Sequence, residues 1–142
     1  MKILLLFAFT LLFHEYAVSP AIAQPAPPVG LACIAEMSVP TYRGVVWLSR
    51  TAGQATISID IGSNGFPISV DVQSAQPLLV RYLKVSMQTV RFIDRCAGQT
   101  IKMTFVYRLI GDPGPEPRNE VTLKPQNTFE ISARPPISHS EP

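Results

Sequence analysis

Two carboxylates on neighbouring alternating runs are the side chains in this chain best suited to acid–base chemistry. Asp60 lies in the run 55–61 and Asp71 in the run 68–72, where apolar residues recur at every second position. If the runs pair as a hairpin with one shared apolar face, Asp71 lies opposite Thr56, and the two aspartate α-carbons are roughly 13 Å apart. Two carboxylates that share one proton lie much closer, and a glycosidase pair stands about 6.5–9.5 Å apart. The spacing therefore predicts no acid–base dyad.

Histidine and serine are no better placed for nucleophilic chemistry. Beyond the N-terminal leader described below, His139 is the one histidine, and it lies close to the C-terminus. This position argues against Ser-His or Cys-His catalysis and against histidine-ligated metals. Ser86 falls on the apolar stripe of an expected helix, where a small residue packs. The sequence contains no phosphate loop or dinucleotide fingerprint, so we predict no catalytic residue, cofactor or metal site, and an enzyme with unrecognised chemistry stays a third alternative.

The two cysteines, Cys33 and Cys96, have the spacing of a structural cross-link rather than of a redox pair. They are the only cysteines in the chain and do not form a C-x-x-C motif. In an oxidising compartment such a pair forms one disulfide. The bridge would close a loop of about 64 residues and contribute up to ~4 kcal/mol in the chain-entropy account. Two unpaired thiols are the alternative.

The N-terminus has the features of an export signal. Lys2 precedes an apolar run over 3–13, and the stretch ending at 21–23 has the small residues of an A-x-A cleavage site. We therefore expect residues 1–23 to be a cleaved signal peptide and the protein to be periplasmic or secreted. A retained membrane anchor is the alternative, although eleven helical residues span roughly 16 Å, about half of a hydrocarbon core. A lipoprotein signal ending at Cys33 is a second, weaker alternative to the cleaved signal peptide.

Composition indicates one soluble domain without affinity for nucleic acid. The 142-residue chain contains twelve Lys and Arg and ten Asp and Glu, so its net charge is +2. A charge this close to zero does not imply a nucleic-acid partner. Residues 24–39 form a proline-rich lead-in, and the length that remains suits a single domain. The residues after 135 are expected to be a disordered tail.

The runs around Asn64 predict a β-hairpin with a shared apolar face. Asn-Gly is favoured in two-residue turns because both positions tolerate positive φ. Directly opposite residues of an antiparallel pair share a face, and an even loop such as 63–64 keeps the apolar residues together. The expected pairs are Ile59 with Ile68, Ile57 with Val70, and Ala55 with Val72.

A helix and a long strand follow the hairpin. Pro77 suits a first helical turn, and an apolar stripe recurs at three and four residues. The stripe consists of Leu79, Tyr82, Leu83, Ser86 and Val90. A second face carries Arg81, Lys84, Gln88 and Arg91, which could dock an acidic partner or be an ordinary solvated face. A strand is predicted over 100–110, and a short helix over 42–50 with Tyr42, Val45, Val46 and Ser49 on its inner side.

These elements predict an α+β fold in two layers. A small antiparallel sheet of three or four strands carries one main helix and a short N-terminal helix on one face. The domain spans 40–110. Residues 111–134 comprise a proline-rich turn and one or more additional strands, around 121–123 and 129–131, and 135–142 form the tail.

The order of elements resembles the C-terminal domain of TonB, the periplasmic energy-coupling protein. Tyr42 and Gly53 keep the family's spacing between its first tyrosine and a glycine eleven residues on. A strand, a glycine turn, a second strand and a helix led by Pro-Leu-Leu follow, here 57–61, 62–65, 70–74 and 77–79. Val90-Arg91-Phe92 stands where the family has Trp-x-Phe. The resemblance covers residues 40–110 and implies helices packed on one face of a small antiparallel sheet.

The resemblance implies a non-enzymatic protein–protein interaction module of the bacterial envelope, with no cofactor. Its partner would be an envelope protein, such as an outer-membrane receptor, bound by strand addition at a sheet edge. Lys102, Thr104, Val106 and Arg108 would line the outer face of that strand. The segment around Phe129 covering the same edge is an equally weighted alternative. The alternative is a structural or self-associating envelope protein, such as a homodimer, that has lost the coupling role.

Overall fold

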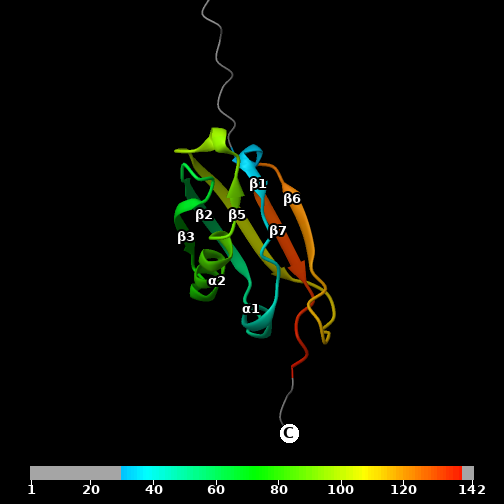
Figure 1. Cartoon of the computed structure of the whole chain (residues 1–142). Coiled ribbons are helices and arrows are strands. Elements are labelled where there is room, and N and C mark those ends of the chain that lie inside the picture. The colour runs from blue at the N-terminus through cyan, green and yellow to red at the C-terminus, as the bar shows by residue number, and fades with distance from the viewer. Residues whose placement is uncertain (1–29, 139–142) are drawn as a thin grey trace, which may run out of the picture.

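The computed structural model describes residues 30–138, which form two layers, a five-stranded sheet with helices on one of its faces (Figure 1). The predicted α+β class is confirmed. The predicted signal peptide, residues 24–29 of the lead-in and residues 139–142 lie outside the described residues. The elements in chain order are η1 (Gly30–Cys33), β1 (Ile34–Glu36), α1 (Gly44–Leu48), β2 (Gly53–Ile61), β3 (Pro67–Ser74), α2 (Pro77–Met87), β4 (Arg91–Phe92), η2 (Asp94–Cys96), β5 (Thr100–Leu109), β6 (Glu120–Lys124) and β7 (Thr128–Ala133).

The sheet has five strands in the order β3-β2-β5-β7-β6, with β1 and β4 forming a separate two-stranded pair. The prediction of three or four antiparallel strands was wrong in two respects. Both segments after the proline-rich turn form strands, and β5 pairs with β7 in parallel. The parallel pairing follows from the connection: residues 110–119 and β6 carry the chain back along the sheet before β7 begins.

The β2–β3 hairpin keeps the predicted shared face but not the predicted partners. Ile59 pairs with Val70 and Ile57 with Val72, two residues away from the expected register. A bulge at the start of β3 opposes Ile61 to Pro67 and leaves Ile68 76% exposed. The loop therefore spans 62–66 rather than two residues. Because the shift is even, Ile57, Ile59, Val70 and Val72 stay on one face.

Two helices cover the apolar face of the sheet and close one continuous core. Helix α2 buries Leu79, Leu83 and Met87, and Val90 just beyond it is buried as well. Tyr82 and Ser86 of the predicted stripe are only half-buried. The predicted helix over 42–50 shortens to α1, which buries Val46 and Trp47. Its predicted inner residue Val45 is 60% exposed, because the indole of Trp47 supplies more apolar area than valine.

The segments flanking the domain are fixed to it. Residues 30–39 of the predicted lead-in contain η1 and β1, and β1 pairs with β4. Tyr107 donates from its hydroxyl to the Pro40 carbonyl, and its ring meets Tyr42 edge-on with centroids 5.1 Å apart. At the other end, the Trp47 indole donates to the Arg134 carbonyl at 2.6 Å. Residues 135–138 of the predicted tail follow directly and pack on the domain, where a β-bridge joins Pro136 to Gly114.

Candidate binding surfaces

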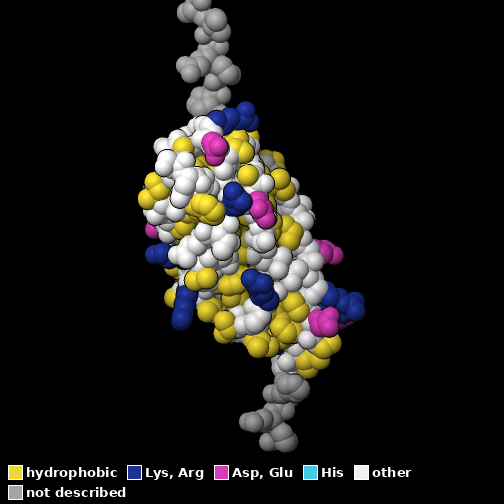
Figure 2. Space-filling view, viewed as in Figure 1, with side chains coloured by type: hydrophobic (Ala, Val, Ile, Leu, Met, Phe, Trp, Pro, Cys, Tyr) yellow, Lys and Arg dark blue, Asp and Glu magenta, His cyan; other side chains and the backbone are white. Residues whose placement is uncertain are grey.

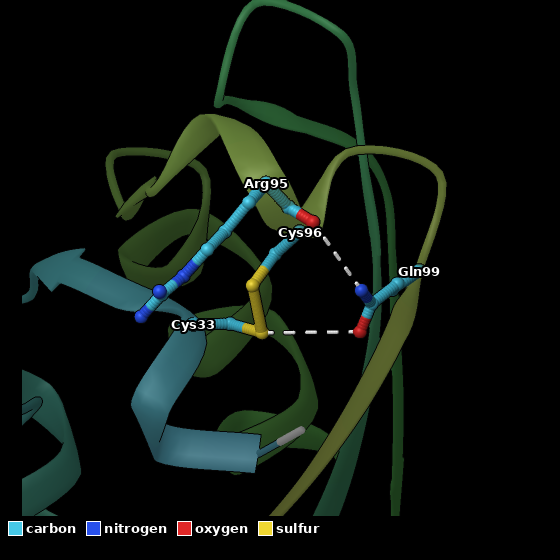
Figure 3. The surroundings of a disulfide bond; sticks show 4 residues. All are labelled: Cys33, Arg95, Cys96 and Gln99. Carbon is cyan, nitrogen blue, oxygen red and sulfur yellow. Dashed lines mark hydrogen bonds between the residues drawn. A yellow bond between two sulfur atoms is a disulfide. The ribbon is translucent and has the colours of Figure 1, made fainter. Parts of the chain in front are cut away.

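The cystine lies at the end of the molecule where the N-terminal segment meets the turn after β4. Cys33 and Cys96 form a disulfide with α-carbons 5.7 Å apart, and both residues are fully buried. Figure 3 shows Gln99 beside it, its amide oxygen 3.9 Å from the sulfur of Cys33 and its amide nitrogen donating to the Arg95 carbonyl. The predicted disulfide is confirmed. Its burial and its position between η1 and η2 give it a structural role.

The four residues predicted to line a partner-binding strand do share the outer face of the sheet. Lys102 and Arg108 are exposed, and Thr104 and Val106 are half-buried. Strand addition along their strand was the wrong mode, because β5 is the central strand and already pairs with β2 on one side and β7 on the other. Strand β7, which contains Phe129, pairs with β5 and so occupies the edge that strand addition would need. The alternative in which the chain covers its own edge is the correct one.

The outer face of the sheet carries hydroxyl and charged side chains. Asp60 accepts hydrogen bonds from the hydroxyls of Ser69, at 2.6 Å, and Thr100, and these two bonds lower the pKa of its carboxyl. Asp71 pairs with Ser58, two residues from Asp60 along β2, which is closer than the predicted register placed it. Both oxygens of Asp60 are thus engaged by hydroxyl donors, which hold it in its ionised form.

A groove runs between the two helices on the opposite side of the molecule. It has a volume of about 510 Å³, and an adjoining hollow of about 260 Å³ shares three of its lining residues. The groove is lined by Arg43, Val45, Leu78, Arg81, Tyr82, Val85 and Ser86. Val45 and Val85 are 60% and 64% exposed. Two exposed apolar side chains that line one concavity make this groove a candidate binding surface.

Hydrogen bonds hold the floor of the groove in place. The Tyr82 hydroxyl, which rises from α2, donates to the Thr41 carbonyl at 2.7 Å and so ties the helix to the segment before α1. The Ser86 hydroxyl donates to the Tyr82 carbonyl at 2.9 Å, inside its own helix. The arginines at the rim behave differently, because within residues 30–138 the guanidinium groups of Arg43 and Arg81 make no hydrogen bond and no ion pair. The groove therefore has a fixed floor and two uncommitted cations.

The two segments that contain the helices carry basic charge alone. The segments that build the helical layer, 37–52 and 74–93, contain no aspartate or glutamate. Their charged residues are all basic, namely Arg43, Arg50, Arg81, Lys84 and Arg91. Figure 2 shows hydrophobic and basic side chains together over α1 and α2, with acidic ones elsewhere on that face. This arrangement produces a positive potential over an apolar groove.

Two of these five cations are partly committed within the molecule. Arg50 donates to the Pro136 carbonyl and to the Ser138 hydroxyl, and Arg91 lies over the ring of Phe66 at 5.4 Å from its centroid. The remaining three surround the groove or stand on the next turn of α2. Of the predicted basic face, Arg81 and Lys84 lie on α2, whereas Gln88 caps the helix and Arg91 belongs to β4. Arg43, the N-cap residue of α1, adds a cation on the opposite wall of the groove.

Sequence reasoning found the basic face but missed the groove. The stripe of Arg81 and Lys84 follows from helical spacing, whereas the opposite wall depends on how α1 sits against α2. The available signal was the complete lack of carboxylates across 37–52 and 74–93. No helix within residues 30–138 is long and apolar enough to cross a membrane.

Comparison with protein-family models, with curated proteins and with solved structures finds no match to this chain.

Proposed function

We propose that this chain is an exported, non-enzymatic protein-binding module of the bacterial cell envelope. Its groove between α1 and α2 takes an acidic, amphipathic segment of a partner protein. The observation that carries the proposal is the coincidence of an open apolar groove with two helix-bearing segments, 37–52 and 74–93, whose charged residues are all basic. Apolar anchors in the groove would supply affinity, and the surrounding cations would supply orientation and on-rate.

The two rim arginines are suited to carboxylate recognition. Guanidinium groups bind carboxylates in a bidentate fashion and stack on apolar surface, and arginine is enriched among the residues that dominate binding energies. Arg43 precedes α1 and Arg81 lies on α2, and both line the groove. An occupant with an apolar face toward Val45 and Val85 and acidic residues at its borders satisfies both features.

The hydroxyl and carboxylate groups support a binding role rather than catalysis. The Ser86 hydroxyl is held by a carbonyl of its own helix, and the hydroxyls of Tyr42 and Tyr107 donate to backbone carbonyls. Asp60 keeps a lowered pKa, the opposite of what a general acid at neutral pH requires. These groups are occupied in maintaining the fold.

The order of elements supports a TonB-like origin of the domain, and the cystine supports export. β2, β3, α2 and β5 follow one another as the resemblance implies, with an antiparallel β3-β2-β5 sheet under the helix. β7 closes the edge of β5, so the proposed module differs from that family in its mode of binding. A buried disulfide is typical of proteins that fold in an oxidising compartment.

The test is a quantitative capture experiment with matched charge reversals. The oxidised protein is immobilised, and envelope extract of the host is passed over wild type, Arg43→Glu/Arg81→Glu and Lys102→Glu/Arg108→Glu. Both variants lose the same number of positive charges, but only the first alters the groove. We expect a specific partner to be retained by wild type and by the sheet-face variant, and its recovery from the groove variant to fall at least about tenfold, with weaker capture at high salt.

Anionic vesicles of phosphatidylglycerol provide the competing ligand. If the groove variant loses vesicle binding while no protein is captured, the ligand is a membrane surface and the proposal is wrong. Equal capture of the same partner by all three proteins would also overturn it, because the groove would then have no part in binding.

A further inference from the structure

The two edges of the sheet are not alike. β3 begins at Pro67 and is interrupted by a bulge beside Ile68, both of which are devices that prevent an edge from pairing with another strand. β6 has neither. Its register with β7 is continuous over all five residues, and within residues 30–138 no further backbone hydrogen bond reaches its outer side. β6 is therefore the regular, accessible edge.

The sequence of β6 is complementary to itself in the antiparallel direction. β6 reads Glu-Val-Thr-Leu-Lys from Glu120 to Lys124. Centred on Thr122, two antiparallel copies place Glu120 of one opposite Lys124 of the other, twice over. The same register places Val121 opposite Leu123, also twice. Each charged residue thus meets its opposite and each apolar residue meets an apolar one, and cross-strand pairs of both kinds stabilise sheets.

The apolar residues of β6 lie on the core side of the sheet without helical cover. Val121 pairs with Ile131 and Leu123 with Phe129, whose side chains are buried in the core. Val121 and Leu123 themselves remain 42% and 55% exposed, and in Figure 1 the helices lie over the other half of the sheet. A second copy at this edge would bury these side chains and continue the apolar face across the junction.

We propose that β6 pairs with β6 of a second copy around a two-fold axis through Thr122. The result is a homodimer with one continuous ten-stranded sheet. A two-fold axis across an antiparallel edge is perpendicular to the sheet, so both helical layers lie on the same face and both grooves point the same way. The inference uses a different surface from the proposed partner groove and does not depend on it. An edge of five residues buries less than a standard interface, so the dimer belongs to the weak class.

Charge swaps at the two ends of β6 test this register directly. Sedimentation velocity of the oxidised protein is measured from about 5 µM to about 1 mM. We expect wild type to dimerise with rising concentration. Glu120→Lys and Lys124→Glu each place like charges opposite one another at both ends, so each should weaken the dimer at least about fivefold. The double swap Glu120→Lys/Lys124→Glu restores opposite charges and should dimerise like wild type.

Mixing the two single variants gives the sharpest readout. Glu120→Lys and Lys124→Glu present two lysines against two glutamates, so the mixture should form a heterodimer more readily than either variant forms a homodimer. Lys102→Glu on the central strand is the matched control and should dimerise like wild type. Thermal melting of each dilute variant confirms that it is folded. A wild type that stays monomeric to about 1 mM, single variants that dimerise unchanged, or a mixture that does not associate would each overturn the proposal.

Discussion

At the scale of single residues, the close approach of the hairpin loop to β4 depends on the lack of a side chain at Gly65. Its φ of 74° lies in the left-handed region, and a Cβ there would lie 2.7 Å from the Phe92 carbonyl oxygen. The same glycine accepts a hydrogen bond from the Phe92 amide at 2.8 Å. Gly65 therefore serves both the turn and the contact between the loop and β4.

Gly65→Ala should destabilise the protein by about 2–4 kcal/mol, because a left-handed alanine costs roughly 1–2 kcal/mol and the backbone clash adds to it. Gly98→Ala is the matched control. Gly98 has a φ of 78° but no atom within 4 Å of the added Cβ, so it should show the conformational cost alone. Urea unfolding of both variants measures the difference. Equal losses at the two positions would contradict the close approach.

The buried tyrosines predict a loss of stability at alkaline pH. Burial raises the pKa of Tyr42 to about 12 and raises that of Tyr107 further. The unfolded chain ionises near pH 10, so the stabilising contribution is complete below about pH 10 and is lost as the pH rises toward about 12. Tyr42→Phe removes this titration and also the hydrogen bond to the Thr51 carbonyl.

We expect Tyr42→Phe to be about 1 kcal/mol less stable than wild type at pH 7, and the gap to narrow above pH ~10. Urea midpoints measured at several pH values provide the comparison. Lysines titrate in the same pH range, but both proteins contain the same lysines. Their effect therefore cancels when the variant is compared with wild type at each pH. A gap that stays constant from neutral to strongly alkaline pH would show that the hydroxyl ionises equally in both states.

At the scale of elements, the alternation of apolar residues predicted the strands well but not how they are joined. The hairpin face follows from period-two spacing, since any even register keeps Ile57 and Ile59 inside. The exact partners depend on the five-residue loop, in which the Asn64 side chain accepts from the Phe66 amide at 3.1 Å. A local turn of this kind competes with the two-residue hairpin that Asn-Gly favours.

The position of β7 could not be derived from its own residues. Thr128–Ala133 alternates as any half-buried strand does, and both a free β5 edge and a covered one suit that pattern. The covered edge results from tertiary packing, in which Phe129 stacks on Phe105 with ring centroids 5.0 Å apart. Burial of those two rings decides between the alternatives, and their pairing is a contact between distant parts of the chain.

Removing the cystine should weaken the attachment of the N-terminal segment. Cys33→Ser/Cys96→Ser should lower the free energy of unfolding by about 2–4 kcal/mol, because the bridge closes a long loop with a separation of 63 residues. Hydrogen exchange should show the largest increase in η1, β1 and β4, which the bridge joins to the body. Urea unfolding of the oxidised wild type is the reference. A loss below about 0.5 kcal/mol would mean that packing alone holds the segment.

At the scale of the whole molecule, the two faces differ in the chemistry of their exposed side chains. The outer face of the sheet mixes acidic, basic and hydroxyl groups, whereas the helical layer combines exposed valines with uncompensated arginines. A near-neutral net charge of +2 conceals this segregation. Composition alone therefore suggested no charged partner. The uneven distribution of carboxylates along the chain indicates where basic residues are in excess, and the fold brings those residues together on one surface.

The groove also depends on features that no local pattern encodes. Its two walls come from α1 and α2, which are separated in sequence by the whole β2–β3 hairpin. The exposed side of α1 is set by Trp47, whose indole reaches the Arg134 carbonyl near the C-terminus. Helical spacing at 42–50 predicted the helix but placed Val45 inside. The long-range anchor of Trp47 is what turns Val45 outward into the groove.

Site-specific photocrosslinking in the host envelope tests the central claim most directly. A photoreactive residue is placed singly at one of four positions. Val45 and Val85 line the groove, whereas Gln73 and Thr122 lie on the sheet, outside the groove lining. The account predicts that the groove positions crosslink one partner protein through an acidic, amphipathic segment. The sheet positions should not crosslink that partner, and Thr122 should crosslink only a second copy of the chain. Crosslinks to that partner from the sheet positions alone would contradict it.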